Sequence, residues 1–544
     1  MISNFKRWQL DVFHGVSAAH LQSYLDKSSY RLNRRDQRLD LFRRILDRCV
    51  LYTPPTTYFH LIAAPVEGMA YHVNHSEGWC GKIETPPNEQ EPWLACIIHD
   101  MVAHRPVTQG RLVGLRLAEG EFMSPYDIAY VRDQFPALAR VIDRHAAVYL
   151  DGPGGTQTPR RVLDAVRGYL ADHNANCDGR FATSRETDAI IAEARQAGAD
   201  LLGCEPVEVS FGANMTTLTY LLAEALGRRM KPGDEVVITA LDHEANRSPW
   251  AQLAERGVIV REVPVDPATC VLDWPAFEAL VRPGRTKVVA LGHASNAVGT
   301  INDVAAAARW ARAAGAWSVV DAVHSAPHTP LDVRAIGCDF LLCSAYKFFG
   351  PHVGLLFARR DATAQVEPLR LSTQTPEPPF IWETGTLNSE GMAGTIAAVD
   401  FIADLGERHM SVVEGDLLGD LKGRRRAVVA GMLAAHAYEQ PLARWLRDEL
   451  ADIAGVTLYG PPQGTPRTST VSFTLDRLYA GEAAHALGER GFFVWDGDFY
   501  AARLVEVLGL AERGGLIRVG LAPYTTQGEL ERFVEAVDDL SQPL

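Results

Sequence analysis

The sequence has no cysteine after residue 343, no cysteine pair with metal-binding spacing, and no long apolar run. Its eight cysteines stand at positions 49, 80, 96, 177, 204, 270, 338 and 343, without a CxxC motif. We therefore interpret them as reduced thiols and predict no metal site. Because no apolar stretch of about 18 residues occurs and the N-terminus lacks a signal-peptide core, we expect no membrane span and a cytoplasmic location.

The net charge and the chain length argue against two further classes of protein, general nucleic-acid binders and single-domain proteins. The 544 residues carry a formal net charge of −14, which argues against general nucleic-acid binding. The first 62 residues are an exception, with ten Lys and Arg against five Asp and Glu. A chain of this length is too long for one ordinary core, so we expect two or more domains.

From about Met123 onward, helical stretches alternate with short β-branched runs. Helices are predicted at Pro159–Tyr169, Thr187–Ala197, Thr216–Leu226 and Val304–Ala314. Strands are predicted at Val207–Phe211, Glu235–Thr239, Val258–Val263, Lys287–Leu291, Trp317–Val320 and Phe340–Cys343. This alternation predicts an α/β fold with a mainly parallel sheet covered by helices on both faces. Catalytic groups are then expected at the carboxyl ends of the strands.

The pattern divides this part of the chain into a large domain, 123–405, and a smaller α+β domain, 406–544. An alternative is that the first ~25 residues of the large domain join the small one. Small-domain strands are predicted at Thr457–Tyr459, Thr468–Phe473 and Phe492–Val494, followed by a helix from Gln527 to the end.

An acid and a lysine lie at two neighbouring predicted strand ends. Asp321 closes the run Trp317–Val320, and Lys347 comes just after Phe340–Cys343. Pyridoxal 5'-phosphate chemistry needs a lysine for the Schiff base and an acid that keeps the pyridine nitrogen protonated. The pair therefore predicts this cofactor.

Other predicted strand ends carry side chains suited to the same cofactor. The imidazole of His243 can stack on a flat ring and move protons, and Asn296 and His324 can hydrogen-bond a phenolate oxygen. Phe211–Thr217 opens a helix whose N–H groups suit a phosphate. Taken alone, each of these features is explained equally well as a core residue, a surface residue or a simple turn. Together with the acid and the lysine, they favour a cofactor site.

These residues carry a resemblance to a known family. Residues from about 123 to 540 resemble the class V aminotransferase family of fold-type I pyridoxal phosphate enzymes, in its cysteine desulfurase-like branch. The matching stretches are Tyr149–Gly155, Asn174–Asn176, Gly212–Asn214, Asp242–Trp250, Ser295–Thr300, Asp321 with His324, Ser344 with Lys347, Glu383–Asn388 and Ile517–Arg518.

The resemblance implies a role for each residue around the cofactor ring. Lys347 would form the internal aldimine, and Asp321 would pair with the pyridine nitrogen. His243 would stack on the ring, while Asn296 and His324 would bind its oxygen. Lys347, once freed, would remove the α-proton of an amino acid to give a quinonoid.

The resemblance also implies phosphate and substrate contacts. Ala213, Asn214 and Ser344 would hold the phosphate. Thr386 would reach the phosphate of a neighbouring subunit, which implies a homodimer. Arg518 would bind the carboxylate of an amino-acid substrate through two N–H groups, a role that lysine fills poorly.

The chain departs from the family where cysteine desulfurases carry their thiol. The corresponding loop reads Trp495–Tyr500 and has no cysteine. Tyr346 replaces the histidine that usually precedes the lysine, and Cys343 is expected to pack as a small apolar residue. We therefore expect β-elimination of the C–S lyase type without a persulfide. Transamination, epimerisation and true cysteine desulfuration stay open. Tyr500 is either an acid for the leaving group or a packing residue.

The N-terminal segment suggests a rival function. Residues 3–62 resemble the C-terminal tail of an ISXO2-like transposase, through Ser3–Trp8, His14–Ser17, His20–Asp26 and Tyr30–Arg35. A basic helix pair of no particular role is the alternative, as is a DNA-associated protein with an incidental enzyme-like domain. The metal-binding carboxylates of such a transposase would precede Met1, so we expect no DNA cleavage. We interpret 1–62 as a fused fragment, 63–122 as a linker without a packed core, and Met123 as an enzyme start.

Overall fold

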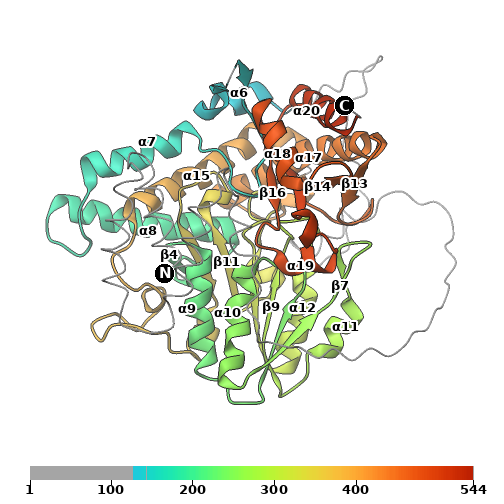
Figure 1. Cartoon of the computed structure of the whole chain (residues 1–544). Helices are drawn as coiled ribbons and strands as arrows, with labels where there is room; N and C mark the ends of the chain where they lie inside the picture. The colour runs from blue at the N-terminus through green and yellow to red at the C-terminus, as the bar shows by residue number, and fades with distance from the viewer. Residues whose placement is uncertain (1–125, 143, 414, 543–544) are drawn as a thin grey trace, which may run out of the picture. The chain divides into compact units, whose positions relative to one another are not determined.

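A computed structural model describes residues 126–542 apart from positions 143 and 414 (Figure 1). The predicted transposase-like segment 1–62 and linker 63–122 lie outside these residues, so the interpretations made for them stay predictions. Among the described residues, no helix combines the length and apolarity needed to cross a membrane.

The centre of the described chain is a seven-stranded sheet in the order β4-β12-β11-β10-β9-β5-β6. All neighbouring strands are parallel except β12, which pairs antiparallel with both β11 and β4. The mainly parallel sheet predicted from the sequence is therefore confirmed, and the six predicted strands are present to within two residues. The strands are β4 (Val209–Gly212), β5 (Glu235–Thr239), β6 (Ile259–Val263), β9 (Thr286–Gly292), β10 (Trp317–Asp321), β11 (Phe340–Ser344) and β12 (Gly354–Ala358).

Helices cover both faces of this sheet because successive strand residues point to opposite sides. On one face, strand residues such as Val320 pack in a core with α8, α12, α15 and α17. On the other, strand residues such as Val319 pack with α9 and α10. The helices are α7 (Arg160–Gly168), α8 (Ala182–Leu202), α9 (Met215–Gly227), α10 (Ser248–Ala251), α12 (Val304–Ala314), α15 (Ser389–Arg408) and α17 (Gly423–Asp452).

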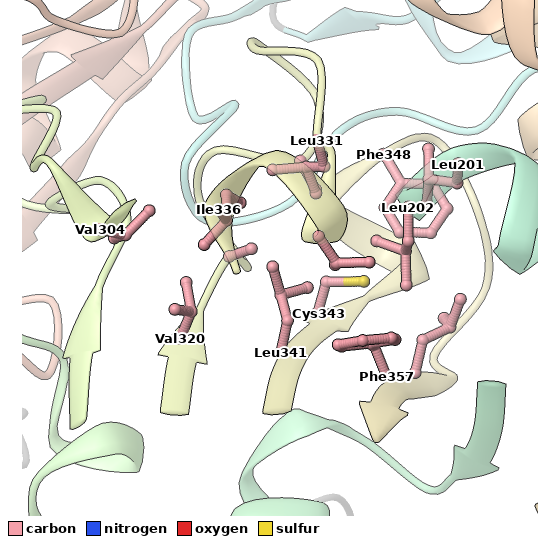
Figure 2. Close-up of a cluster of buried hydrophobic side chains, with 14 of the residues drawn as sticks. Leu201, Leu202, Val304, Val320, Leu331, Ile336, Leu341, Cys343, Phe348 and Phe357 are labelled. Atoms are coloured by element: carbon pink, nitrogen blue, oxygen red, sulfur yellow. The ribbon is translucent and has the colours of Figure 1, made fainter. Parts of the chain in front are cut away.

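Cys343 belongs to the first of these cores. Its sulfur points towards Leu202 and away from Leu341 (Figure 2), in a core that also contains Leu201 and Phe357, and the residue is 0% exposed. Burial raises the pKa of this thiol far above its ordinary value. The interpretation of Cys343 as a packing residue is confirmed.

The C-terminal part forms a second, antiparallel sheet of four strands in the order β13-β14-β17-β16. Helix α20 begins at Gln527, as predicted, and packs on this sheet with α17 and α18. The elements are β13 (Val456–Tyr459), β14 (Thr470–Leu475), β16 (Trp495–Gly497), β17 (Leu516–Gly520), α18 (Ala480–Glu489) and α20 (Gln527–Ser541).

A segment near the start of the described chain packs with this C-terminal part. Strand β3 (Val148–Tyr149) pairs with β15 (Phe492–Phe493), and Val148 and Leu150 lie in the C-terminal core. Helix α15 runs across residue 405, where the sequence predicts the end of the large domain. The division of the chain into two domains at that point stays a prediction.

Candidate active site

The predicted site residues meet where the parallel strands of the central sheet end. Lys347 follows β11, Asp321 ends β10, and Asn296 follows β9. Arg518 reaches the same place from β17 of the second sheet and donates from Nη1 to the Asn296 carbonyl oxygen at 3.1 Å. The site therefore lies between the two sheets and contains side chains from both.

Lys347 stands on a single 3-10 turn, Ala345–Lys347, directly after β11. Its Nζ donates to the carbonyl oxygens of Pro153 and, at 3.1 Å, of Gly154. Burial lowers the pKa of this amine to about 7, and the positive charge of Arg518 acts in the same direction. A lysine that is partly neutral near pH 7 can attack a carbonyl and can accept a proton.

Asp321 is 8% exposed, and one carboxylate oxygen accepts the N–H of Val323 at 2.9 Å. Burial, with a smaller contribution from the nearby Asp242, raises the pKa of this carboxyl to about 7. A buried acid of this kind is stabilised in its charged form by a cation placed against it. A protonated pyridine nitrogen is such a cation, so Asp321 fits the predicted cofactor.

His243 is held as a neutral ring. Its Nδ1 accepts the N–H of Ala245 at 2.9 Å, which leaves Nε2 as the nitrogen that carries the proton. Burial, together with Lys347 and Arg518, lowers the pKa of His243 to about 3. A flat uncharged imidazole is suited to lie against an aromatic ring.

The N-terminus of α9 carries the features of a phosphate site. Asn214 caps the helix by accepting the Thr217 N–H at 2.9 Å, and Ser344 accepts the Met215 N–H at 3.0 Å. The strand on the other side passes so close that a Cβ on Gly354 would lie 2.5 Å from the Asn214 carbonyl carbon. The Met215 and Thr217 N–H groups are thus already paired, but the Ser344 hydroxyl keeps a proton to donate, and the start of a helix favours a negatively charged group such as a phosphate.

Asn296 and Arg518 each present one buried polar atom without a hydrogen-bond partner in the described structure, Oδ1 of Asn296 and Nε of Arg518. The Asn296 amide donates to the Phe499 carbonyl at 2.9 Å, and Nη2 of Arg518 lies 2.9 Å from the Asp151 carboxylate. Buried polar atoms are normally paired, so these two atoms indicate a place for a polar ligand. The free atom of Asn296 is an acceptor. The amide nitrogen carries two N–H groups and donates one of them to Phe499, so the predicted bond to a phenolate oxygen would use the other.

His324 is buried. Its Nε2 lies 3.0 Å from the hydroxyl oxygens of Thr468 and Thr470 on the C-terminal side. Burial lowers the pKa of His324 well below its ordinary value, and His328 and Lys347 act in the same direction. The predicted contact between His324 and a cofactor oxygen stays a prediction.

Tyr500 lies beside His243 and is 66% exposed. Its ring centroid is 5.4 Å from that of His243, and its carbonyl accepts the Glu244 N–H at 2.6 Å. Tyr500 and the preceding Phe499 both have left-handed backbone angles, with φ of 58° and 55°. Non-glycine residues seldom adopt this conformation, so the hydrogen bonds to the site hold the loop in place.

Thr386 and Ala213 are exposed rather than enclosed by the described residues. Thr386 follows Glu383, which is fixed by Arg195 through two contacts of 2.7 Å. Thr386 is thus exposed three residues after a position held by an ion pair, which is compatible with a contact to a second subunit. The homodimer stays a prediction.

Three residues of the site were given no individual role from the sequence: Asp151, Tyr346 and Phe499. Asp151 pairs with Arg518, Tyr346 lies beside the Lys347 amine, and the Phe499 ring lies 4.4 Å below the Arg518 guanidinium. Asp151 stands inside the quoted stretch Tyr149–Gly155, which is the one signal that pointed to it. No pattern in the sequence indicates its pairing with a residue 367 positions away.

The chain matches the family model described as aminotransferase class-V over residues 148–424 and 427–533. It is 32% identical over 422 residues to a probable cysteine desulfurase of Pseudomonas aeruginosa, an alignment that covers 75% of this chain and 96% of the relative. It is 29% identical over 440 residues to a cysteine desulfurase of Serratia proteamaculans, covering 77% and 99%.

Two solved structures are similar to the described fold. The apo structure of a cysteine desulfurase from Thermococcus onnurineus NA1 gives a TM-score of 0.67 at 26% identity, covering 76% of this chain and 98% of that one. The cysteine desulfurase CsdA from Escherichia coli gives 0.65 at 26% identity, with the same coverage. The predicted α/β fold of type I is confirmed.

Proposed function

The chain belongs to the aminotransferase class V family, whose members use pyridoxal 5'-phosphate, and we propose that it eliminates a β-substituent from an amino acid. The bond cleaved is of the C–S type, and the released sulfur is not passed to a cysteine of this chain. The geometry around Lys347, Asp321 and Arg518 supports action at the α-carbon of the amino acid.

Each site residue then has a chemical task. When bound, pyridoxal phosphate withdraws electrons from the α-carbon of an attached amino acid. Lys347 binds the cofactor aldehyde and, when free and neutral, accepts the α-proton at Nζ. Asp321 keeps the pyridine nitrogen protonated, and Arg518 holds the substrate carboxylate in place. His243 covers the ring and excludes water from that face.

The remaining contacts complete the site. Ser344, Asn214 and the backbone of Ala213 hold the phosphate at the start of α9. Asn296 and His324 bind the ring oxygen. Tyr500, exposed beside His243, donates a proton to the leaving group. A homodimer completed through Thr386, a cytoplasmic location and the absence of a nucleic-acid partner belong to the same proposal.

The observation that carries this proposal is the state of the thiols. The loop Trp495–Tyr500 has none, and the pKa is raised for each of the five cysteines among the described residues. Burial is the largest cause in every case. Sulfur attack requires a thiolate, so none of the cysteines in the described part of the chain is prepared for it. Cys49, Cys80 and Cys96 lie outside the described residues.

A product screen tests the proposal. The purified full chain is incubated with cysteine and other β-substituted amino acids, and sulfide, pyruvate, keto acids and D-isomers are measured. We expect free sulfide and pyruvate in equal amounts without added reductant, and no extra sulfur mass on the protein. Alanine together with a protein-bound persulfide would instead establish a cysteine desulfurase. Keto acid that retains the β-substituent would indicate an aminotransferase, and D-isomers would indicate an epimerase.

Substitution of Arg518 by lysine tests the substrate contact. The guanidinium contacts both Asp151 and Asn296, and its Nε has no hydrogen-bond partner among the described residues. A lysine, by contrast, is a single point charge. We expect kcat/KM to fall by about 30-fold or more, mainly through KM, because a buried charged contact to the carboxylate is lost. Arg513→Lys is the matched control, since Arg513 donates to the Leu475 and Asp476 carbonyls away from the site. An unchanged KM in Arg518→Lys would contradict the assigned role.

A further inference from the structure

Three electron-rich groups converge on the amine of Lys347. Its Nζ lies 4.9 Å from the centroid of the Tyr346 ring. The same nitrogen donates to the carbonyl oxygens of Pro153 and, at 3.1 Å, of Gly154. A turn before α7 and the residue next to the lysine therefore supply all three contacts.

The Tyr346 ring is itself fixed in position. It stacks on His352 with centroids 4.9 Å apart and planes inclined by 17°. On its edge it meets Gly155 so closely that a Cβ there would lie 3.2 Å from Cδ2 of the tyrosine. The Tyr346 carbonyl accepts the N–H of Thr156 at 3.2 Å. The ring is held against the same turn that supplies the two carbonyls.

These contacts favour the charged form of the amine. Carbonyl oxygens accept hydrogen bonds more strongly from an ammonium than from a neutral amine, and an aromatic face attracts a cation within about 6 Å of its centroid. Burial and Arg518 act against the charge, while Asp151 and Asp321 act with it. The other titratable groups around the amine are His243 and His324, which burial keeps neutral.

We propose that Tyr346, with the carbonyls of Pro153 and Gly154, forms a receiving site for the Lys347 amine whenever it is not bonded to the cofactor. This inference rests on the proposed role of Lys347. The free amine takes up a proton at Nζ, and the receiving site stabilises the resulting ammonium and holds it just beyond the end of β11. Tyr346 is a positioning residue, because it acts through the lysine.

The test measures the lysine itself, in the full chain freed of cofactor. The protein is treated with a trace of acetic anhydride at a series of pH values, and acetylation of Lys347 is quantified by mass spectrometry. Only the neutral amine reacts, so the midpoint of the labelling curve reports the proton affinity of Lys347. Lys287, which is 32% exposed and lies at the start of β9, serves as the internal reference.

Tyr346→Leu removes the aromatic face, and Tyr346→Phe keeps it. We expect the Lys347 midpoint to fall by about half a unit to one and a half units in Tyr346→Leu. Labelling below the midpoint becomes faster, since more of the amine is neutral there. In Tyr346→Phe the midpoint stays at the wild-type value. Tyr346→Met, a second aliphatic variant, is expected to follow leucine if Tyr346→Leu does not fold.

The proposal is overturned if the leucine and methionine variants keep the wild-type midpoint, or if phenylalanine shifts it as far as leucine does. The second outcome would assign the effect to the hydroxyl rather than to the ring. Because the labelling is done without cofactor, its result does not depend on which reaction the enzyme catalyses. Failure of the cofactor role of Lys347 would appear separately, as an unchanged cofactor spectrum in Lys347→Ala.

Discussion

Lys347→Ala is expected to abolish the visible absorbance band of the lysine-bound cofactor and to lower kcat at least about 1,000-fold. The alanine has no amine to bind the cofactor aldehyde and none to accept the α-proton. The protein should still fold, because the removal costs the hydrogen bonds of the amine to the Pro153 and Gly154 carbonyls and its contact with the Tyr346 ring, and takes away no apolar core contact. The measurement is an absorbance spectrum of protein purified with added pyridoxal phosphate.

A lysine elsewhere in the same sheet is the matched control. Lys287 lies on β9 and donates to the Gly284 carbonyl at 2.9 Å, at the opposite end of the strand from Asn296. Lys287→Ala should keep both the band and the activity. A band of wild-type intensity in Lys347→Ala would place the cofactor lysine elsewhere and would remove the basis of the proposed function.

The sequence was enough to predict where such a lysine would lie, because the carboxyl ends of parallel strands meet at one edge. Asp321, Asn296 and Lys347 each follow a run of apolar residues, and the structure brings them together. Strand β12 (Gly354–Ala358) was not predicted. Its run of apolar residues has no period-two alternation, so the pattern alone does not distinguish it from a buried helical segment. Its antiparallel direction follows from the short connection to β11.

What sequence patterns could not supply are the contacts between distant segments. The pairing of Asp151 with Arg518 and the contact of Asn296 with Phe499 depend on how the second sheet packs against the first. The sequence showed that Tyr346 departs from the family pattern, but it did not show which group the tyrosine contacts. Only the structure shows that its ring lies beside the lysine amine. Such contacts are set by tertiary packing and leave no periodic signal.

Asp321→Asn is expected to lower kcat by about 100- to 1,000-fold while the cofactor stays bound, a range typical for the loss of one preorganised electrostatic contact. Asparagine has the same shape and can still accept the Val323 N–H that Asp321 accepts at 2.9 Å. It carries no charge, however, so it cannot hold the pyridine nitrogen protonated. The ring then withdraws electrons from the α-carbon less strongly, and the proton that Lys347 must remove becomes less acidic.

A second buried acid at the opposite end of strand β10 separates this effect from the general cost of removing a buried carboxylate. Asp339 accepts the N–H and the hydroxyl of Ser318 at 2.7 and 2.9 Å and lies far from the strand end that carries Asp321. Asp339→Asn should lower the free energy of unfolding by about 1–3 kcal/mol and leave kcat of the folded enzyme unchanged. Asp321→Asn should instead lower kcat and leave the free energy of unfolding nearly unchanged. A kcat within about threefold of wild type in Asp321→Asn, well under the loss expected for such a contact, would show that the acid does not act on the cofactor nitrogen.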